Sequence, residues 1–122
     1  MTAPFAALHL MGNLHACNAP RALLENAAHL REHCLALARQ TGLTVVGDYF
    51  HQFTRGGGVT GTVVLAESHL AVHTWPESNY VTLDVFVCNV SCDNRPKAQA
   101  LFDALVAGFE ADDPRFYQMD RA

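Results

Sequence analysis

The stretch Leu65-Ala66-Glu67-Ser68-His69-Leu70-Ala71-Val72-His73-Thr74-Trp75-Pro76-Glu77 places reactive side chains between two apolar, strand-like segments. Ser68 directly follows Glu67, and His69 and His73 come soon after the serine. An unpaired polar group buried in a protein costs roughly 1–3 kcal/mol of stability. Packing alone therefore does not explain why a strand region carries so many polar groups, and we expect this stretch to perform chemistry.

The surrounding chain predicts an α+β fold, namely a mainly antiparallel sheet with two helices packed on one face. Alternating or apolar runs predict strands over residues 7–16, 43–53, 59–67, 69–75 and 80–88, with a short last strand over 116–119. One helix is expected to open at Asn18-Ala19-Pro20 and to end at Gly42. A second helix is expected to start at Asp93 or Asn94, with its buried stripe formed by Ala98, Leu101, Phe102, Leu105 and Phe109.

The strand over residues 80–88 has two chemically different faces. One face carries only aliphatic residues and suits the surface beneath the helices, whereas the other is mixed and consists of Thr82, Asp84, Phe86 and Cys88. A mixed face is a poor dry core and a poor bare surface. We therefore expect it to meet a second subunit or to line a site.

Composition limits the classes of partner. The 122 residues suffice for one domain, residues 1–122, and the net charge of −4 without a basic cluster argues against nucleic-acid binding. No signal peptide is evident, and no run approaches the ~20 apolar residues of a membrane span. The expected compartment is the cytoplasm.

The cysteines and histidines do not predict a metal site. None of the four cysteines forms a CxxC pair, so Cys17, Cys34 and Cys92 are expected to be reduced and mostly buried. His69 and His73 face the same way on a strand, but no third ligand has suitable spacing.

The central stretch closely resembles the self-processing segment of the short prokaryotic, pyruvoyl-dependent S-adenosylmethionine decarboxylases. The resemblance extends to Gly58-Val59-Thr60-Gly61, to residues 82–88 and to His9-Leu10, and it covers roughly residues 7–110. It implies cleavage between Glu67 and Ser68 into residues 1–67 and 68–122, with Ser68 becoming a pyruvoyl group that forms a Schiff base with the substrate. It also implies a homodimer of cleaved protomers, joined as a layered sandwich with active sites close to the interface.

The resemblance assigns the chemistry to particular side chains. The Ser68 hydroxyl attacks the Glu67 carbonyl and converts the amide into an ester, which then eliminates. His73 is the processing base, and its ordinary pKa suits proton transfer near neutrality. Thr60, at a position often occupied by serine in relatives, keeps the processing hydroxyl. Cys88 matches the proton donor of the decarboxylation step, although the residue type alone would favour a core cysteine.

The resemblance also suggests residues for substrate recognition. Glu77 matches the carboxylate that holds the ribose hydroxyls of S-adenosylmethionine, and Phe53 matches an aromatic residue against the adenine. A solvated turn glutamate and a core phenylalanine are the plainer interpretations. Asn13 occupies a position that is commonly acidic in relatives, which together with the neighbouring His15 alters the charge of the site.

Three functions follow as hypotheses. The first is a decarboxylase of S-adenosylmethionine that supplies the aminopropyl donor for spermidine synthesis. The second keeps the pyruvoyl chemistry and acts on L-ornithine or L-arginine. The third is an uncleaved, non-catalytic regulatory subunit, against which the intact Glu67-Ser68, His73 and Cys88 set argues.

Overall fold

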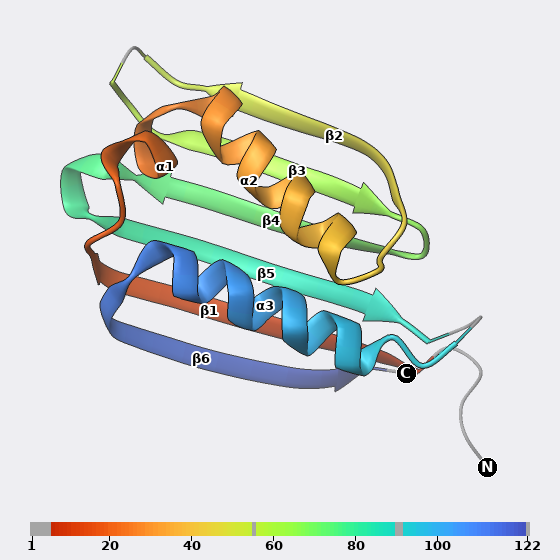
Figure 1. Cartoon of the computed structure of the whole chain (residues 1–122). Coiled ribbons are helices and arrows are strands. Elements are labelled where there is room, and N and C mark those ends of the chain that lie inside the picture. The colour runs from red at the N-terminus through yellow and green to blue at the C-terminus, as the bar shows by residue number, and fades with distance from the viewer. Residues whose placement is uncertain (1–5, 55, 90–91, 122) are drawn as a thin grey trace.

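The computed structural model describes residues 6–54, 56–89 and 92–121, which form one antiparallel sheet with helices on one side (Figure 1). Within these ranges the sheet has six strands in the order β2-β3-β4-β5-β1-β6. The strands are β1 Ala7–Cys17, β2 Val45–Gln52, β3 Val59–Leu65, β4 Ser68–Trp75, β5 Tyr80–Cys88 and β6 Ala111–Arg121. The predicted α+β class with an antiparallel sheet is confirmed.

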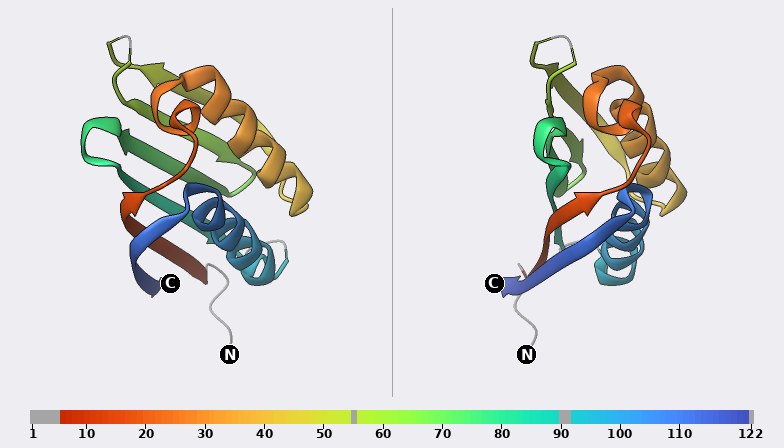
Figure 2. Two further views of the ribbon diagram at one scale, coloured as in Figure 1. Left: turned by 60° about the vertical axis from the view of Figure 1, so that its left-hand side comes forward. Right: turned by 90° about the vertical axis from the view of Figure 1, so that its left-hand side faces the viewer.

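The helices cover a single face of the sheet, as the edge-on view in Figure 2 shows. They are α1 Arg21–Glu25, α2 Ala27–Gln40 and α3 Arg95–Phe109, and a 3-10 turn, η1, spans Pro76–Ser78. All five residues predicted for the buried stripe of the second helix are buried on α3. The aliphatic side chains of β5 are also buried, so the two-faced pattern of residues 80–88 is confirmed. The core lies between this face of the sheet and the helices.

The predicted helix between residues 18 and 42 is in fact two helices. Asn26 has an extended backbone (φ −121°, ψ 111°) that separates α1 from α2, and its side chain caps α2 by accepting from His29 N at 3.0 Å. Asn18 instead donates its side-chain amide to the Glu110 carbonyl at 3.1 Å. An asparagine that can bond to the backbone competes with helix continuation, which explains the break. The predicted end at Gly42 is confirmed, since α2 ends at Gln40, Thr41 is its C-cap, and Gly42 follows with φ 85°.

The last strand is longer than predicted. Instead of spanning 116–119, β6 runs over Ala111–Arg121 and pairs with β1 along almost its whole length. It is an edge strand whose residues are nearly all exposed, so no apolar alternation marks its ends. Pro114 is tolerated there because an edge strand needs fewer backbone donors.

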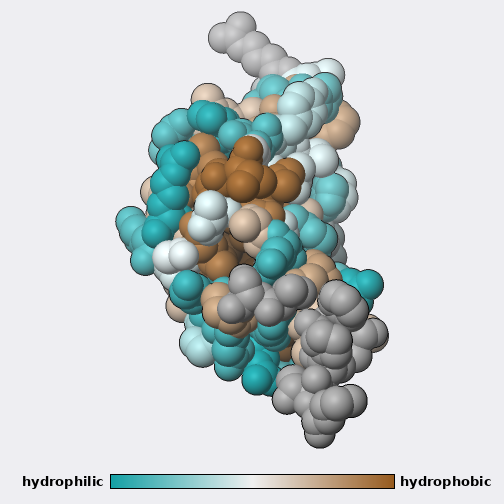
Figure 3. Space-filling view, turned by 90° about the vertical axis from the view of Figure 1, so that its right-hand side faces the viewer, coloured by the Kyte–Doolittle hydropathy of each residue, from teal (hydrophilic) through white to brown (hydrophobic). Residues whose placement is uncertain are grey.

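The face of the sheet opposite the helices is open. No described element packs over it, and Tyr117 and Met119 of β6 are more than half exposed on it, beside Met11 and His9. Figure 3 looks at the end of the sheet where β3 ends and β4 begins, and it shows a hydrophobic patch with hydrophilic residues around it. At this end the side chains of Val46 and Val64, on the paired strands β2 and β3, are 63% and 45% exposed. In the described part of the chain, no helix has both the length and the hydropathy needed to span a bilayer.

Candidate active site

The Glu67–Ser68 peptide lies at the β3–β4 hairpin. Leu65 and Ser68 pair across a turn formed by Ala66 and Glu67, and Ser68 is the first residue of β4. Glu67 has a left-handed backbone with φ 66°. The serine is 8% exposed, whereas the glutamate before it is exposed. The hairpin thus presents the predicted scission site at the end of the sheet rather than within a strand.

Cys88 is adjacent to Ser68 because β5 pairs with β4. Ser68 is opposite Val87 in the ladder, and the Cys88 backbone N–H donates to Ser68 Oγ at 3.4 Å. Cys88 is half-buried and belongs to the open face, whereas the Ser68 side chain follows the buried alternation of β4. The two residues are therefore neighbours through the Cys88 backbone, and their side chains lie on opposite faces of the sheet.

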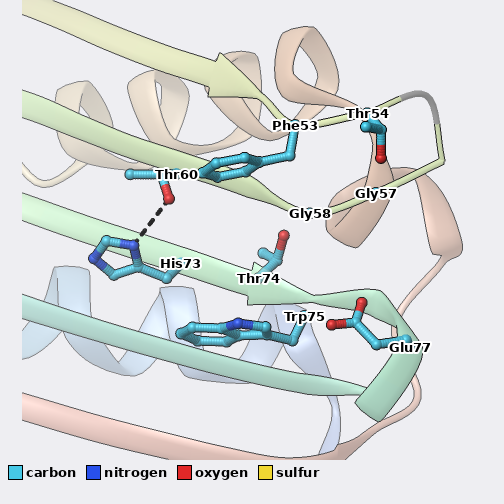
Figure 4. A pocket seen from close by; sticks show the side chains of 9 residues that line it. All are labelled: Phe53, Thr54, Gly57, Gly58, Thr60, His73, Thr74, Trp75 and Glu77. Atoms are coloured by element: carbon cyan, nitrogen blue, oxygen red, sulfur yellow. Dashed lines mark hydrogen bonds between the residues drawn. The ribbon is translucent and has the colours of Figure 1, made fainter.

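A second group of predicted residues surrounds a cavity of about 350 Å³ near the other end of β4. Phe53, Thr60, His73 and Glu77 all line it. Thr60 Oγ1 and His73 Nδ1 are 3.1 Å apart, within hydrogen-bond distance. Figure 4 shows the Phe53 ring near Thr60 and the ring of Trp75 near His73, with Glu77 on the turn that follows β4. The cavity therefore combines a base, a hydroxyl, a carboxylate and two aromatic surfaces.

The backbone around this cavity is held by a buried threonine. Thr74 Oγ1 donates to the Leu24 carbonyl at 2.7 Å and accepts from Val59 N at 2.8 Å. These bonds join β4 to α1 and β3 at the cavity wall. The turn that carries Glu77 is tied to α1 by Arg21, which bonds to the Pro76 carbonyl at 3.0 Å and also to the side chain of Asn79.

The two groups are far apart in a single chain. His73 and Ser68 are five residues apart on β4, which corresponds to about 16 Å at ~3.3 Å per residue. A hydrogen bond between these side chains would require a separation of about 3 Å. One chain by itself therefore does not bring the predicted processing base to the predicted scission site.

Asn13 is aligned with the second group. It pairs with Thr82 on one side and with Arg115 on the other, and Thr82 in turn pairs with His73. One strand, β5, lies between Asn13 on β1 and His73 on β4, so two inter-strand spacings put their backbones about 10 Å apart. Asn13 lines a separate cavity of about 360 Å³ together with His9, Met11, Asp84 and Tyr117 among others.

The open face also carries a cluster that the sequence did not single out. His9 Nε2 is 2.8 Å from an Asp84 carboxylate oxygen, and His69 Nε2 is 3.8 Å from the same oxygen. The Phe86 ring contacts both histidine rings. The Arg121 guanidinium lies over the Phe86 ring, 4.7 Å from the centroid of that ring. Strand alternation had placed His9 and Asp84 on mixed faces, but their contact depends on the β1–β5 register. Within the described residues, no group of histidines, cysteines and carboxylates is arranged to hold a metal ion.

The cysteines differ in their surroundings. Burial raises the pKa of the Cys17 thiol to about 11 and that of Cys34 to about 12, so both stay protonated as core residues. The prediction that Cys92 is mostly buried is wrong, because this residue is exposed in the segment before α3. Its thiol donates to Asn94 Oδ1 at 3.1 Å. A short connection after a strand places few neighbours around such a side chain.

Known proteins share both the sequence and the fold. The family model described as S-adenosylmethionine decarboxylase matches residues 8–122. The S-adenosylmethionine decarboxylase proenzyme of Thermococcus onnurineus is 35% identical over 107 residues, covering 80% of this chain and 75% of that protein. The proenzyme of the same name from Thermotoga maritima is 36% identical over 99 residues, covering 81% and 74%. The crystal structure of the adenosylmethionine decarboxylase from Aquifex aeolicus is 25% identical and superposes with a TM-score of 0.83, covering 98% of this chain and 93% of that one. This protein therefore belongs to the S-adenosylmethionine decarboxylase family.

Proposed function

We propose that this chain is the proenzyme of a pyruvoyl-dependent S-adenosylmethionine decarboxylase that cuts itself between Glu67 and Ser68. The observation that carries the proposal is the exposed hairpin turn at Glu67, with Ser68 next to Cys88 at its end. The exposed turn puts this peptide bond at the surface and outside the middle of a strand. Family membership and the names of the relatives support the substrate.

The surroundings of Ser68 fit a pyruvoyl group. The Cys88 backbone N–H that reaches Ser68 Oγ would donate to an oxygen at the same place. A pyruvoyl group supplies an electron-accepting carbonyl for the decarboxylation of an amino acid. In this proposal Cys88 delivers a proton to the substrate carbon, and the burial of position 68 limits access of water.

The second group of residues is proposed to act on both processing and binding. His73 takes a proton during self-cleavage, and the contact with Thr60 Oγ1 orients its ring. Glu77 and Phe53 hold the ribose and the adenine of the substrate in the cavity of about 350 Å³. An exposed carboxylate beside an aromatic ring suits a ligand with hydroxyls and a flat base.

The separation of the two groups supports a homodimer. A site that needs both Ser68 and His73 is complete when a second copy supplies the missing group, because the two are about 16 Å apart in one chain. The uncovered sheet face, with its exposed apolar side chains, suits an interface between two copies. We therefore include in the proposal the homodimeric sandwich that the family resemblance implies.

Intact-protein mass spectrometry tests the cleavage. The expected products are residues 1–67 and residues 68–122, the second beginning with a pyruvoyl group, and Ser68→Ala should leave the chain whole. An uncut wild-type chain in an active preparation would contradict the mechanism.

Release of carbon dioxide tests the substrate. S-adenosylmethionine, ornithine and arginine should be assayed in parallel with the cleaved protein, and only the first is expected to react. Turnover of ornithine or arginine instead would overturn the substrate while leaving the pyruvoyl chemistry in place.

A further inference from the structure

The proposed scission site lies directly after a strained residue. Glu67 has φ 66° and is the second residue of a two-residue turn between β3 and β4. The left-handed conformation brings the Cβ of an ordinary residue too close to the following carbonyl oxygen. Short hairpins usually place glycine, asparagine or aspartate at positions with positive φ. Ala66-Glu67 offers none of these, so the turn stores backbone strain.

The neighbouring structure prevents the turn from relaxing. Ala66 N donates to the Thr44 carbonyl at 3.0 Å, which fixes the first residue of the turn against the segment before β2. Ser68 is paired on both sides, with Leu65 of β3 and Val87 of β5. A strained conformation persists when its surroundings hold it in this way, and such residues gather at functional sites.

The other described non-glycine residues with positive φ have ordinary explanations. Two of them follow helical segments, where left-handed caps are common, and the third is the residue of β1 that has no partner in the β6 ladder. They are Asn79, Glu110 and Ala16. Glu67 is the one at the proposed scission bond.

We propose that the left-handed conformation of Glu67 accelerates self-cleavage, an inference that rests on the proposed function. In the first step the bond from Ser68 Oγ to the Glu67 carbonyl carbon forms and the bond from that carbon to Ser68 N breaks. The hydroxyl proton passes to the nitrogen, so the step needs no other reactant. The path from the Glu67 carbonyl carbon to Ser68 Cα is one bond longer through the ester oxygen and Cβ than through the amide nitrogen. The turn can therefore relax in the ester, and Glu67 acts as a positioning residue through its backbone.

The test compares Glu67→Gly with Glu67→Ala in the full chain. Both variants lose the carboxylate, and they differ by one methyl group, which is the source of the strain. We expect the glycine variant to cleave about 5- to 30-fold more slowly than the alanine variant, as followed by intact mass over time. Glu67→Asn should fall between them, since asparagine tolerates this conformation better than alanine does.

A second measurement separates relief of strain from loosening of the turn. In the uncleavable Ser68→Ala background, Glu67→Gly should raise the midpoint of thermal unfolding above that of Glu67→Ala. Equal cleavage rates of the two variants would refute the inference, and so would a slower glycine variant with a lower midpoint. A wild-type chain that never cleaves would refute the proposed function itself, so the two failures are distinguishable.

Discussion

If two copies of this chain share each active site, two inactive variants should restore cleavage when they are combined. The variants are Ser68→Ala, which lacks the scission serine, and His73→Ala, which lacks the proposed base. Since His73 lies about 16 Å along β4 from Ser68, it cannot act on the serine of its own chain. In a mixed dimer, however, the Ser68→Ala chain supplies His73 to the serine of the other chain.

The expected extent of cleavage follows from symmetry. Random assortment of two variants in a two-fold dimer makes about half of the dimers mixed, and each mixed dimer contains one complete site. The chain cut at that site is the His73→Ala chain, because it retains Ser68. About half of the His73→Ala chains should therefore be cleaved, and none of the Ser68→Ala chains. Alone, His73→Ala should be slowed about 10²–10⁴-fold, the usual contribution of a general base.

The assay is co-expression of the two variants, each with a tag of different mass, followed by intact-mass analysis of both chains. The matched control pairs His73→Ala with the double variant Ser68→Ala/His73→Ala, which should not cleave. If native mass spectrometry shows mixed dimers in which the His73→Ala chain stays whole, while the wild type cleaves, the shared site is refuted.

Three further predictions concern single side chains. Cys88→Ala should still self-cleave but lose about 10²–10⁴-fold in decarboxylation, measured as carbon dioxide release; unchanged turnover would remove Cys88 from the proton-donor role. Arg21→Met should raise the KM for S-adenosylmethionine about three- to tenfold and leave kcat and self-cleavage unchanged, because Arg21 holds the turn that carries Glu77. An unchanged KM in steady-state assays would contradict this role. His33→Leu should raise the free energy of unfolding by about 1 kcal/mol, because the buried Nε2 of His33 has no hydrogen-bond partner among the described residues. The same variant should weaken the pH dependence of stability, because burial, and then the nearby His29, lowers the pKa of His33 in the folded protein. A folded-state pKa below the unfolded value of 6.5 means that wild-type stability falls as pH drops through about 6.5, and denaturation by urea at several pH values should show a flatter profile for the variant.

Local patterns in the sequence were enough to predict most of the elements. The alternation over residues 80–88 predicted β5 with its correct ends and faces, and the apolar stripe predicted the buried side of α3. These predictions succeed because the strand and helix periods are visible wherever one side of an element is buried. Where burial is nearly absent, as along β6, the period disappears and the sequence predicted too short a strand.

The break at Asn26 shows a different limit. Asparagine at Asn18 and Asn26 is equally suited to cap a helix, and both precede apolar residues at helical spacing. The structure uses Asn26, whose side chain bonds to His29 N, while Ala27 N is satisfied by the Gln52 side chain at 2.8 Å. That second contact comes from the end of β2, so a local reading of the helix cannot foresee it.

For the site, the sequence by itself was enough to propose which residues carry the chemistry and to predict which face of the sheet each strand residue joins. The position of Ser68 beside Cys88, and of Thr60 beside His73, was decided by the registers of β4 with β5 and of β3 with β4. Only the tertiary structure assigned these partners, because strand alternation reports the face of a residue and not which residue of another strand lies beside it. The five-residue separation of Ser68 and His73 then puts the two pairs at opposite ends of β4, about 16 Å apart. That distance is the physical reason for placing the complete site between two copies of the chain.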